Sequence, residues 1–290
     1  MALQAHLPSL VLALALALAG LRPAVATPAS AAQAGQGKES KPPTDDPPIG
    51  KGKILLLEDF ESVPAGQIPK GFTKTGAVSV VEDVAHSGRH SLRIEAAPNG
   101  PRRITLKGDV LKELGGQHWG RLYFKVQLPA PVCSSGVIHS TIVAASGKSP
   151  QYKDQIEVRP LDTILNTQQT YGFIYNVQPE KRPEFGKGSE PKFKFTDEWT
   201  LAEWYVDYTT QTYRLFINGK EVKDIAFMKG SGNYEKSEIP EVFESMSFGW
   251  WNYQNAGNGF VVWIDDIALA KDRLGARGVP PPAKGAAKKP

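Results

Sequence analysis

A group of aromatic and amide side chains stands near the C-terminal end of the sequence. The segment WWNYQ places Trp250, Trp251 and Tyr253 beside Asn252 and Gln254. Aromatic rings can pack on the CH faces of a sugar while amides bind its hydroxyl groups, a mixture typical of ligand clefts. Because successive residues of a strand face opposite sides, Trp251 and Tyr253 share one face, and we expect that face to bind sugar. The same rings could instead belong to a hydrophobic core.

A second group of candidate side chains lies in the middle of the chain. The stretch DQIEVRP contains Arg159, whose planar guanidinium can bind a carboxylate through two parallel hydrogen bonds. Alternation puts Gln155, Glu157 and Arg159 on one face of a strand. His139, in the stretch VIHSTI, belongs to a different strand. A single histidine in an apolar strand can be structural or functional, and the sequence leaves open whether the two strand faces coincide.

The elements that must position these residues are predicted to be strands almost throughout. Alternating or β-branched runs are separated by Gly, Pro and Asn clusters at short spacing, as in a sandwich or barrel. The runs cover residues 54–60, 78–84, 91–96, 121–128, 137–145, 171–177, 203–217 and 260–270. Asn218-Gly219 predicts a two-residue hairpin turn, and only residues 110–116 could form one or two helical turns. We expect one all-β sandwich domain over residues 53–275.

Five stretches in this domain carry a resemblance to a known family. They are EDFES at 58–62, VSVVEDVAHSGRHSLRI at 78–94, APNG at 97–100, EWYVDYTTQTYRLFINGKEV at 203–222 and FGWWNYQNAGNGFVVWIDDIALAKDRLG at 248–275. Together they resemble the secreted jelly-roll family of the fungal cellulose-induced protein, which is related to glucuronan and alginate lyases. Residues 145–195 match poorly. The resemblance implies a concanavalin A-like jelly roll, with two antiparallel sheets and a glycan cleft on the concave sheet.

The resemblance implies a polysaccharide lyase that cleaves a uronic-acid-containing glycan by β-elimination. Such cleavage needs a group that neutralises the C5 carboxylate, a base for the C5 proton and an acid for the leaving O4. The family pattern assigns the carboxylate to Arg159 and proton transfer to His139 and Tyr253. The expected substrate contacts are amides and aromatics close to these residues: Gln155, Tyr175, Asn176, Trp251, Asn252 and Gln254.

Two departures from the family pattern surround Arg159. Glu157 stands where a histidine is expected, and Pro160-Leu161-Asp162 replaces a Gly-Gly-Gln sequence. A carboxylate at position 157 would repel a uronate unless Arg159 pairs with it. These departures favour the alternative function, a non-catalytic carbohydrate-binding module on the same fold, whereas the histidine and the tyrosine favour the lyase.

The resemblance also implies a structural calcium ion that ties the two ends of the domain together. Its ligands would be Glu61, Ser87, His90, and Asp265 or Asp266. Calcium takes oxygen ligands from carboxylates and backbone carbonyls, and the serine and the histidine would contribute mainly backbone oxygens. The alternative is that the two aspartates are a polar pair at the end of a strand. No organic cofactor is expected.

The flanking segments predict export. An apolar run over residues 7–21 is followed by Ala24-Val25-Ala26, so residues 1–26 read as a signal peptide that is cleaved near Ala26. Residues 27–52 are a predicted disordered linker, and residues 276–290 a basic disordered tail. We expect a secreted or periplasmic monomer that has no stable membrane span after cleavage and binds a polysaccharide. An uncleaved anchor, and with it a surface-attached structural protein, is the alternative.

Composition and missing motifs exclude several classes of protein. With 41% hydrophobic and 22% charged residues, the chain is neither wholly disordered nor collagen-like. Residues 53–270 carry 24 basic and 26 acidic residues, so the domain lacks the basic surface of a nucleic-acid binder. The single cysteine, Cys133, excludes an internal disulfide. The carboxylate pattern of retaining glucanases is absent, as are the motifs of serine hydrolases, kinases, metalloproteases and dehydrogenases.

Overall fold

The computed structural model describes residues 46–226, 228 and 237–279. The predicted signal peptide, most of the predicted linker and most of the basic tail lie outside these residues. Within the described part of the chain, no helix is long and apolar enough to cross a membrane.

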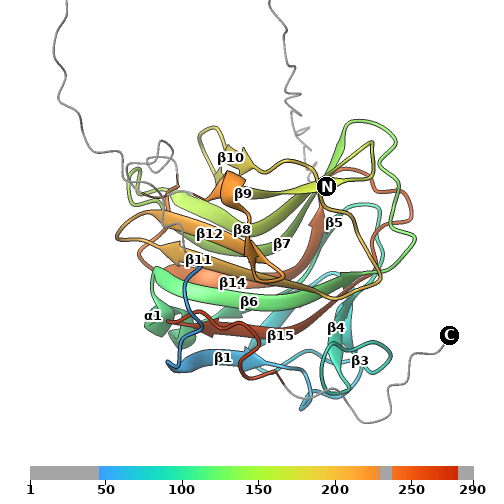
Figure 1. Cartoon of the computed structure of the whole chain (residues 1–290), viewed down its shortest axis with the longest axis horizontal. Helices are drawn as coiled ribbons and strands as arrows, with labels where there is room; N and C mark the ends of the chain where they lie inside the picture. The colour runs from blue at the N-terminus through green and yellow to red at the C-terminus, as the bar shows by residue number, and fades with distance from the viewer. Residues whose placement is uncertain (1–45, 227, 229–236, 280–290) are drawn as a thin grey trace, which may run out of the picture. The chain divides into compact units, whose positions relative to one another are not determined.

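Two antiparallel sheets make up the domain (Figure 1). The eight-stranded sheet has the order β13-β12-β11-β6-β15-β4-β3, and β1 also pairs with β15. Its strands are β1 (Ile54–Glu58), β3 (Val78–Val81), β4 (Ser91–Ile94), β6 (Gln117–Val126), β11 (Thr200–Asp207), β12 (Thr212–Ile217), β13 (Lys220–Glu221) and β15 (Val262–Ala270). The predicted all-β sandwich is therefore confirmed.

The seven-stranded sheet has the order β10-β9-β8-β7-β14-β5-β2. Its strands are β2 (Phe72–Thr75), β5 (Gly100–Lys107), β7 (Val137–Lys148), β8 (Gln155–Asn166), β9 (Tyr171–Pro179), β10 (Phe185–Gly188) and β14 (Phe243–Asn252). One short helix, α1 (Asp109–Leu114), forms where helical turns were predicted, and η1 (Lys223–Ile225) is a single 3₁₀ turn.

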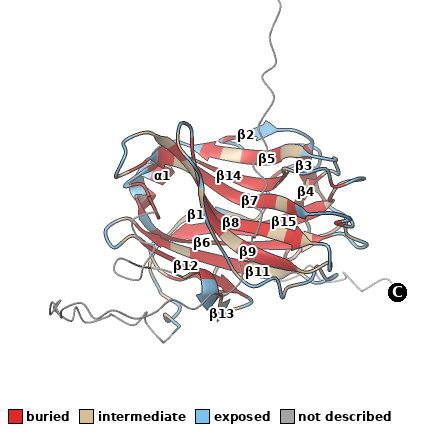
Figure 2. Cartoon of the chain, turned by 90° about the horizontal axis from the view of Figure 1, so that it is seen from above, coloured by how far each residue is buried: buried red, intermediate tan, exposed pale blue. Residues whose placement is uncertain are grey.

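The hydrophobic core lies between the two sheets. Trp204 of β11, Phe124 of β6 and Trp250 of β14 are buried in it. Figure 2 shows buried residues along the central strands of both sheets, whereas β2 and β13 at the sheet ends are largely exposed. Trp251 is only half-buried. The alternation of β14 therefore directs Trp250 into the core and Trp251 to the outer face of the seven-stranded sheet.

Two turns shape the eight-stranded sheet. The predicted hairpin at Asn218-Gly219 is confirmed, since both residues have positive φ (49° and 78°), as a tight hairpin turn requires. The run at 203–217, however, forms two strands instead of one. Oδ1 of Asp207 accepts hydrogen bonds from the backbone N and the hydroxyl of Thr209, at 2.8 and 2.6 Å, and this local turn reverses the chain.

Arginine side chains fasten the two ends of the domain. Arg273 donates a hydrogen bond to the carbonyl of Pro47 at 3.0 Å, and Arg277 donates to the carbonyls of Gly50 and Gly52 at 2.5 and 2.6 Å. Residues 47–52, predicted as linker, therefore lie against the segment that follows β15. These contacts join backbone carbonyls to charged side chains, so the pattern of apolar residues in the sequence does not reveal them.

Candidate functional site

The side chains of His139, Arg159 and Tyr253 converge on the outer face of the seven-stranded sheet. His139 lies in β7, Arg159 lies in β8, and Tyr253 directly follows β14. These three strands are neighbours in the sheet. The ring centroids of His139 and Tyr253 are 4.9 Å apart, and Cζ of Arg159 lies 4.7 Å from the centroid of the Tyr253 ring. The backbone N of Tyr253 donates to the carbonyl of His139 at 3.0 Å, which continues the ladder between β14 and β7.

Asp162 belongs to the same group, although no role in the site was predicted for it. Its Oδ2 lies 2.7 Å from Nε2 of His139, and its side chain is fully buried. Such a hydrogen bond holds the imidazole in one orientation and favours one tautomer. The pairing of β8 with β9 shifts register between Arg159 and Asp162. Their side chains therefore lie on the same face of the sheet, although strict alternation would place them on opposite faces.

A proline within β8 is the signal that could have revealed this shift. Proline cannot donate to the ladder, so inside a sheet it marks an edge or a bulge. Here the carbonyl of Pro160 accepts a hydrogen bond from the hydroxyl of Tyr213, on the opposite sheet, at 2.7 Å. A backbone carbonyl in the irregular stretch of β8 thus accepts a hydrogen bond from a side chain of the opposite sheet.

Arg159 is held by neighbouring side chains on the sheet. It is 4% exposed; its Nε donates to Oε1 of Glu157 at 2.9 Å and its Nη1 to Oδ1 of Asn176 at 3.3 Å. Burial alone would lower the pKa of Arg159, but Tyr253, Asp162 and Glu157 together raise it. Asn176, predicted as a substrate contact, therefore serves here to position the guanidinium.

The hydroxyl of Tyr253 lies 3.1 Å from Oγ1 of Thr141. Burial raises the pKa of Tyr253 well above its ordinary value, and the nearby Arg159 offsets only part of this rise. The phenol is therefore protonated at neutral pH, so it can donate a proton or a hydrogen bond. Gln254, at the exposed end of the site, accepts a hydrogen bond from the backbone N of His139 at 2.7 Å.

A groove of about 330 Å³ lies beside this group. Trp251 stacks on Tyr253 with ring centroids 4.7 Å apart and an interplanar angle of 24°. The residues that line the groove are mainly polar or charged: Arg103, Ser146, Gln155, Ile156, Glu157, Arg159, Gln178, Pro179, Glu180 and Trp251. It therefore combines an aromatic face with amide and charged groups.

Arg103 reaches the groove from β5. Its Cζ lies 5.0 Å from the centroid of the Trp251 ring, a distance at which a cation is attracted to the ring face. Gly249 of β14 pairs with Arg103 in the ladder. A Cβ atom at Gly249 would lie 2.2 Å from the carbonyl oxygen of Arg102, so any side chain there would push β5, and with it Arg103, away from the groove.

Two of the expected substrate contacts do not reach the outer face. Tyr175 is fully buried between the sheets, where its hydroxyl donates to the carbonyl of Ser237. Asn252 is also fully buried, with its Oδ1 accepting from Arg102 at 2.8 Å and its Nδ2 donating to the carbonyl of Pro98 at 2.6 Å. Both side chains point to the inner face of their strand, so neither can touch a ligand in the groove.

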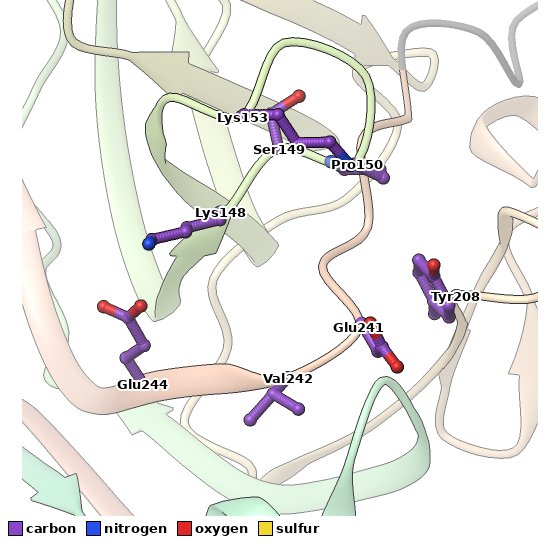
Figure 3. A pocket seen from close by; sticks show the side chains of 8 residues that line it. All are labelled: Lys148, Ser149, Pro150, Lys153, Tyr208, Glu241, Val242 and Glu244. Carbon is purple, nitrogen blue, oxygen red and sulfur yellow. The ribbon is translucent and has the colours of Figure 1, made fainter.

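A second hollow, of about 360 Å³, lies where β7 ends and β14 begins (Figure 3). Its lining includes Lys148, Lys153, Glu241 and Glu244, and its one aromatic side chain is Tyr208. None of the predicted site residues lines it. No amide side chain lines this hollow, whereas Gln155 and Gln178 line the groove at Trp251, so the hollow is the weaker match to a sugar.

The expected calcium ligands gather around the loop at residues 86–90. Oε1 of Glu61 accepts hydrogen bonds from the backbone N of Arg89 and of His90, both at 2.7 Å. Asp265 accepts from the backbone N of His86 at 2.8 Å. Asp266 accepts from the hydroxyl of Ser87 at 2.9 Å and lies 2.7 Å from Nδ1 of His86.

The carboxylates of Asp265 and Asp266 are adjacent and fully buried. Burial, with a contribution from Asp266, raises the pKa of Asp265 to about 8, so its charged form is unfavourable unless a cation is near. The described residues contain no group of three or more His, Cys, Asp or Glu side chains that could surround a metal ion. A calcium ion here would therefore depend on backbone carbonyls for much of its coordination.

Comparison with solved structures identifies the fold. Neither models of known protein families nor curated protein sequences match this chain. Its structure is similar to "Cellulose induced protein, Cip1", with 20% sequence identity and a TM-score of 0.50, over 76% of this chain and 99% of that one. The fold resemblance predicted from the sequence, a jelly-roll sandwich, is thus confirmed.

Weaker structural similarity extends to two botulinum neurotoxin chains. The serotype G binding domain shows 12% identity and a TM-score of 0.47 over 77% of this chain and 49% of that one. A type C neurotoxin, which interacts with two ganglioside molecules, shows 10% identity and a TM-score of 0.48 over 77% of this chain and 48% of that one. This chain thus spans about half the length of each toxin chain.

Proposed function

We propose that this chain binds a polysaccharide along the groove beside Trp251, on the outer face of the seven-stranded sheet. The observation that carries the proposal is the stacked, half-buried pair Trp251 and Tyr253 next to a groove of about 330 Å³. The amides of Gln155 and Gln178 line the same groove. Aromatic faces suit the CH surface of a sugar ring, and amides suit its hydroxyl groups.

Affinity electrophoresis in gels that contain neutral glucans, glucuronan, alginate or pectate tests this proposal. At least one polymer should retard the wild type, and Trp251→Ala should weaken that binding about tenfold or more, a loss of about 1.4 kcal/mol. Tyr152→Ala, which truncates a 55% exposed aromatic side chain outside the groove, should leave it unchanged. Migration unaffected by every polymer, or equal retardation of the wild type and Trp251→Ala, would refute the proposal.

Export belongs to the same proposal, because the polysaccharides that such a protein meets lie outside the cell membrane. The mature chain should then begin near Thr27, which N-terminal sequencing of the protein from its native source would establish. A mature chain that retains residues 1–26 would instead favour a surface-anchored protein.

A finer proposal, favoured by one observation, is eliminative cleavage of a uronate polymer. His139 is hydrogen-bonded to Asp162, and its ring centroid lies 4.9 Å from that of the protonated phenol of Tyr253. In this scheme His139 removes the C5 proton, the C4–C5 double bond forms as the C4–O4 bond breaks, and Tyr253 delivers a proton to O4. The reaction further requires an arginine of the groove to face the substrate carboxylate.

The ultraviolet absorbance of the unsaturated uronate product distinguishes cleavage from binding. A lyase would raise the absorbance with one uronate polymer, and Tyr253→Phe would abolish the rise. If the absorbance stays constant with every uronate polymer while the protein is still retarded in the affinity gel, the chain binds glycans without cleaving them.

We also propose a structural calcium ion at the loop 86–90, held by Glu61, by Asp265 or Asp266, and by the backbone carbonyls of Ser87 and His90. Support comes from the donor chemistry, since two adjacent buried carboxylates suit a hard divalent cation. Excess EDTA should then lower the melting temperature by several degrees, and added calcium should restore it. Equal melting temperatures with EDTA and with calcium would exclude the ion.

A further inference from the structure

We infer that Glu157 acts as a built-in anion that occupies the position between Arg103 and Arg159, so that the groove selects uncharged saccharides over uronates. The inference rests on the proposed glycan binding and names the class of ligand. It concerns a residue at which this chain departs from the pattern that its sequence resembles.

The carboxylate of Glu157 is shared between two guanidinium groups. Its Oε1 accepts a hydrogen bond from Nε of Arg159 at 2.9 Å, and its Oε2 lies 3.5 Å from Nη1 of Arg103. The Glu157 side chain is 20% exposed, and all three residues line the groove. A ligand carboxylate that approached either arginine would therefore meet a resident one.

An aromatic ring also lies against each of the two guanidinium groups. The ring of Tyr253 covers the guanidinium of Arg159, and the ring of Trp251 covers that of Arg103. Asn176 accepts from Nη1 of Arg159 at 3.3 Å. Nε and Nη1 of Arg103 have no hydrogen-bond acceptor but are buried, so a uronate that bound the two cations would require Glu157 to give up its ion pairs.

The charge of the groove points to the same ligand class. Its charged lining residues are two arginines, Arg103 and Arg159, and two glutamates, Glu157 and Glu180, so the formal charges cancel. What the groove still offers, besides the Trp251 ring, is the amide of Gln178 and the amide oxygen of Gln155, whose Nε2 donates to Oε2 of Glu244 at 3.1 Å. Neutral hydrogen-bonding groups next to an aromatic face suit the hydroxyl groups of an uncharged sugar.

This arrangement bears directly on catalysis. A uronate lyase needs a cation that is available to the substrate carboxylate, and in the native chain Glu157 holds the cations that could fill this role. The inference therefore favours a binding module over a lyase, and it identifies Glu157 as the residue that sets the specificity.

The test compares Glu157→Gln, which removes the charge and keeps the shape, with Glu157→Ala, which also opens the space. Glu198→Gln is the matched control, since Glu198 is an exposed glutamate that does not line the groove. Calorimetric titration of each protein with neutral β-glucan and glucuronan oligosaccharides gives the affinities. Thermal melting with and without each oligosaccharide follows both the fold and ligand stabilisation.

The wild type should bind the neutral oligosaccharide and bind the glucuronan oligosaccharide at least tenfold more weakly. Glu157→Gln and Glu157→Ala should each gain at least tenfold in affinity for the glucuronan oligosaccharide, whereas Glu198→Gln should change less than threefold. Comparable wild-type affinity for both ligands, or no gain in either Glu157 variant, would overturn the inference while leaving glycan binding intact. Uronate binding by the variants alone, with no glycan bound by the wild type, would uphold the role of Glu157 and refute the proposed native function. Loss of all binding in every protein would refute both.

Discussion

At the scale of single residues, the carboxylates beside His139 and Arg159 each have a defined partner. Asp162 pairs with His139, and Glu157 pairs with Arg159 and Arg103. An unpaired charge at such positions would be costly because burial removes its hydration. The carboxylates of the site are therefore already bound by neighbouring side chains, and its aromatic rings remain as the main surface that a ligand can contact.

Truncation of Asp162 provides the prediction at this scale. Asp162→Ala should lower the free energy of unfolding by about 1–3 kcal/mol, because the His139 ring and the backbone N of Thr163 lose their acceptor. Asp162→Asn keeps an acceptor oxygen and should cost less. Urea denaturation followed by tryptophan fluorescence measures both, and a variant Asp162→Ala as stable as the wild type would contradict this role.

The sequence identified three residues of the site but not the fourth. His139, Arg159 and Tyr253 could be chosen by residue type and by family resemblance, and alternation correctly placed Trp251 with Tyr253. Asp162 was missed because two-residue periodicity breaks at the bulge that follows Arg159. Side chains on different strands meet only once register is set, and a single sequence does not specify register.

At the scale of elements, strand content and the 218–219 hairpin followed from local patterns, whereas strand ends did not. The run at 203–217 looks continuous in sequence because β-branched and aromatic residues flank the turn that Asp207 forms with Thr209. Of the residues predicted to touch substrate, Tyr175 and Asn252 lie on the inner faces of β9 and β14. Alternation assigns residues to two faces but does not say which face is the core.

A histidine buried in β6 gives the prediction for an element. Burial lowers the pKa of His118 to about 3, against about 6.5 in an unfolded chain. At a pH between these two values, His118 is protonated in the unfolded chain and neutral in the folded chain. Stability is therefore full above about pH 6.5 and is lost as the pH falls towards 3, by up to about 1.4 kcal/mol per pH unit.

His118→Gln removes this titration, and the amide can still donate to the carbonyl of Gly115, which lies 3.4 Å from Nδ1 of His118. Between pH 7 and 5 the free energy of unfolding should fall less steeply for His118→Gln than for the wild type. Parallel slopes would show that His118 is protonated in the folded state.

At the scale of the whole molecule, buried arginines connect the ends of the domain to the eight-stranded sheet. Glu203 of β11 accepts from Nη2 of Arg273 at 3.1 Å and from the backbone N of Gly275 at 2.8 Å. Arg121 of β6 donates to the carbonyl of Gly275 at 2.9 Å. These contacts rigidly join sequence-distant segments, and none of them could be predicted from periodicity or composition.

Removal of Glu203 tests this connection. Glu203→Ala leaves Arg273 buried without its partner and should destabilise the fold by about 3–5 kcal/mol. Lys53→Met, which breaks the exposed pair of Lys53 with Glu113, should cost less than about 1 kcal/mol. Similar melting temperatures for the two variants would show that the buried pair does not hold the segment after β15 in place.

The measurement that tests glycan binding at the outer face most directly follows the indole N–H signals of the six tryptophans by NMR. The protein is titrated with an oligosaccharide of the polymer that retards it, and the Trp251 signal is assigned with Trp251→Phe. The Trp251 signal should move most, while those of Trp119 and Trp263, on the outer face of the eight-stranded sheet, stay in place. Movement of either of these two signals with Trp251 unchanged would place the ligand on the other sheet and contradict the proposed site.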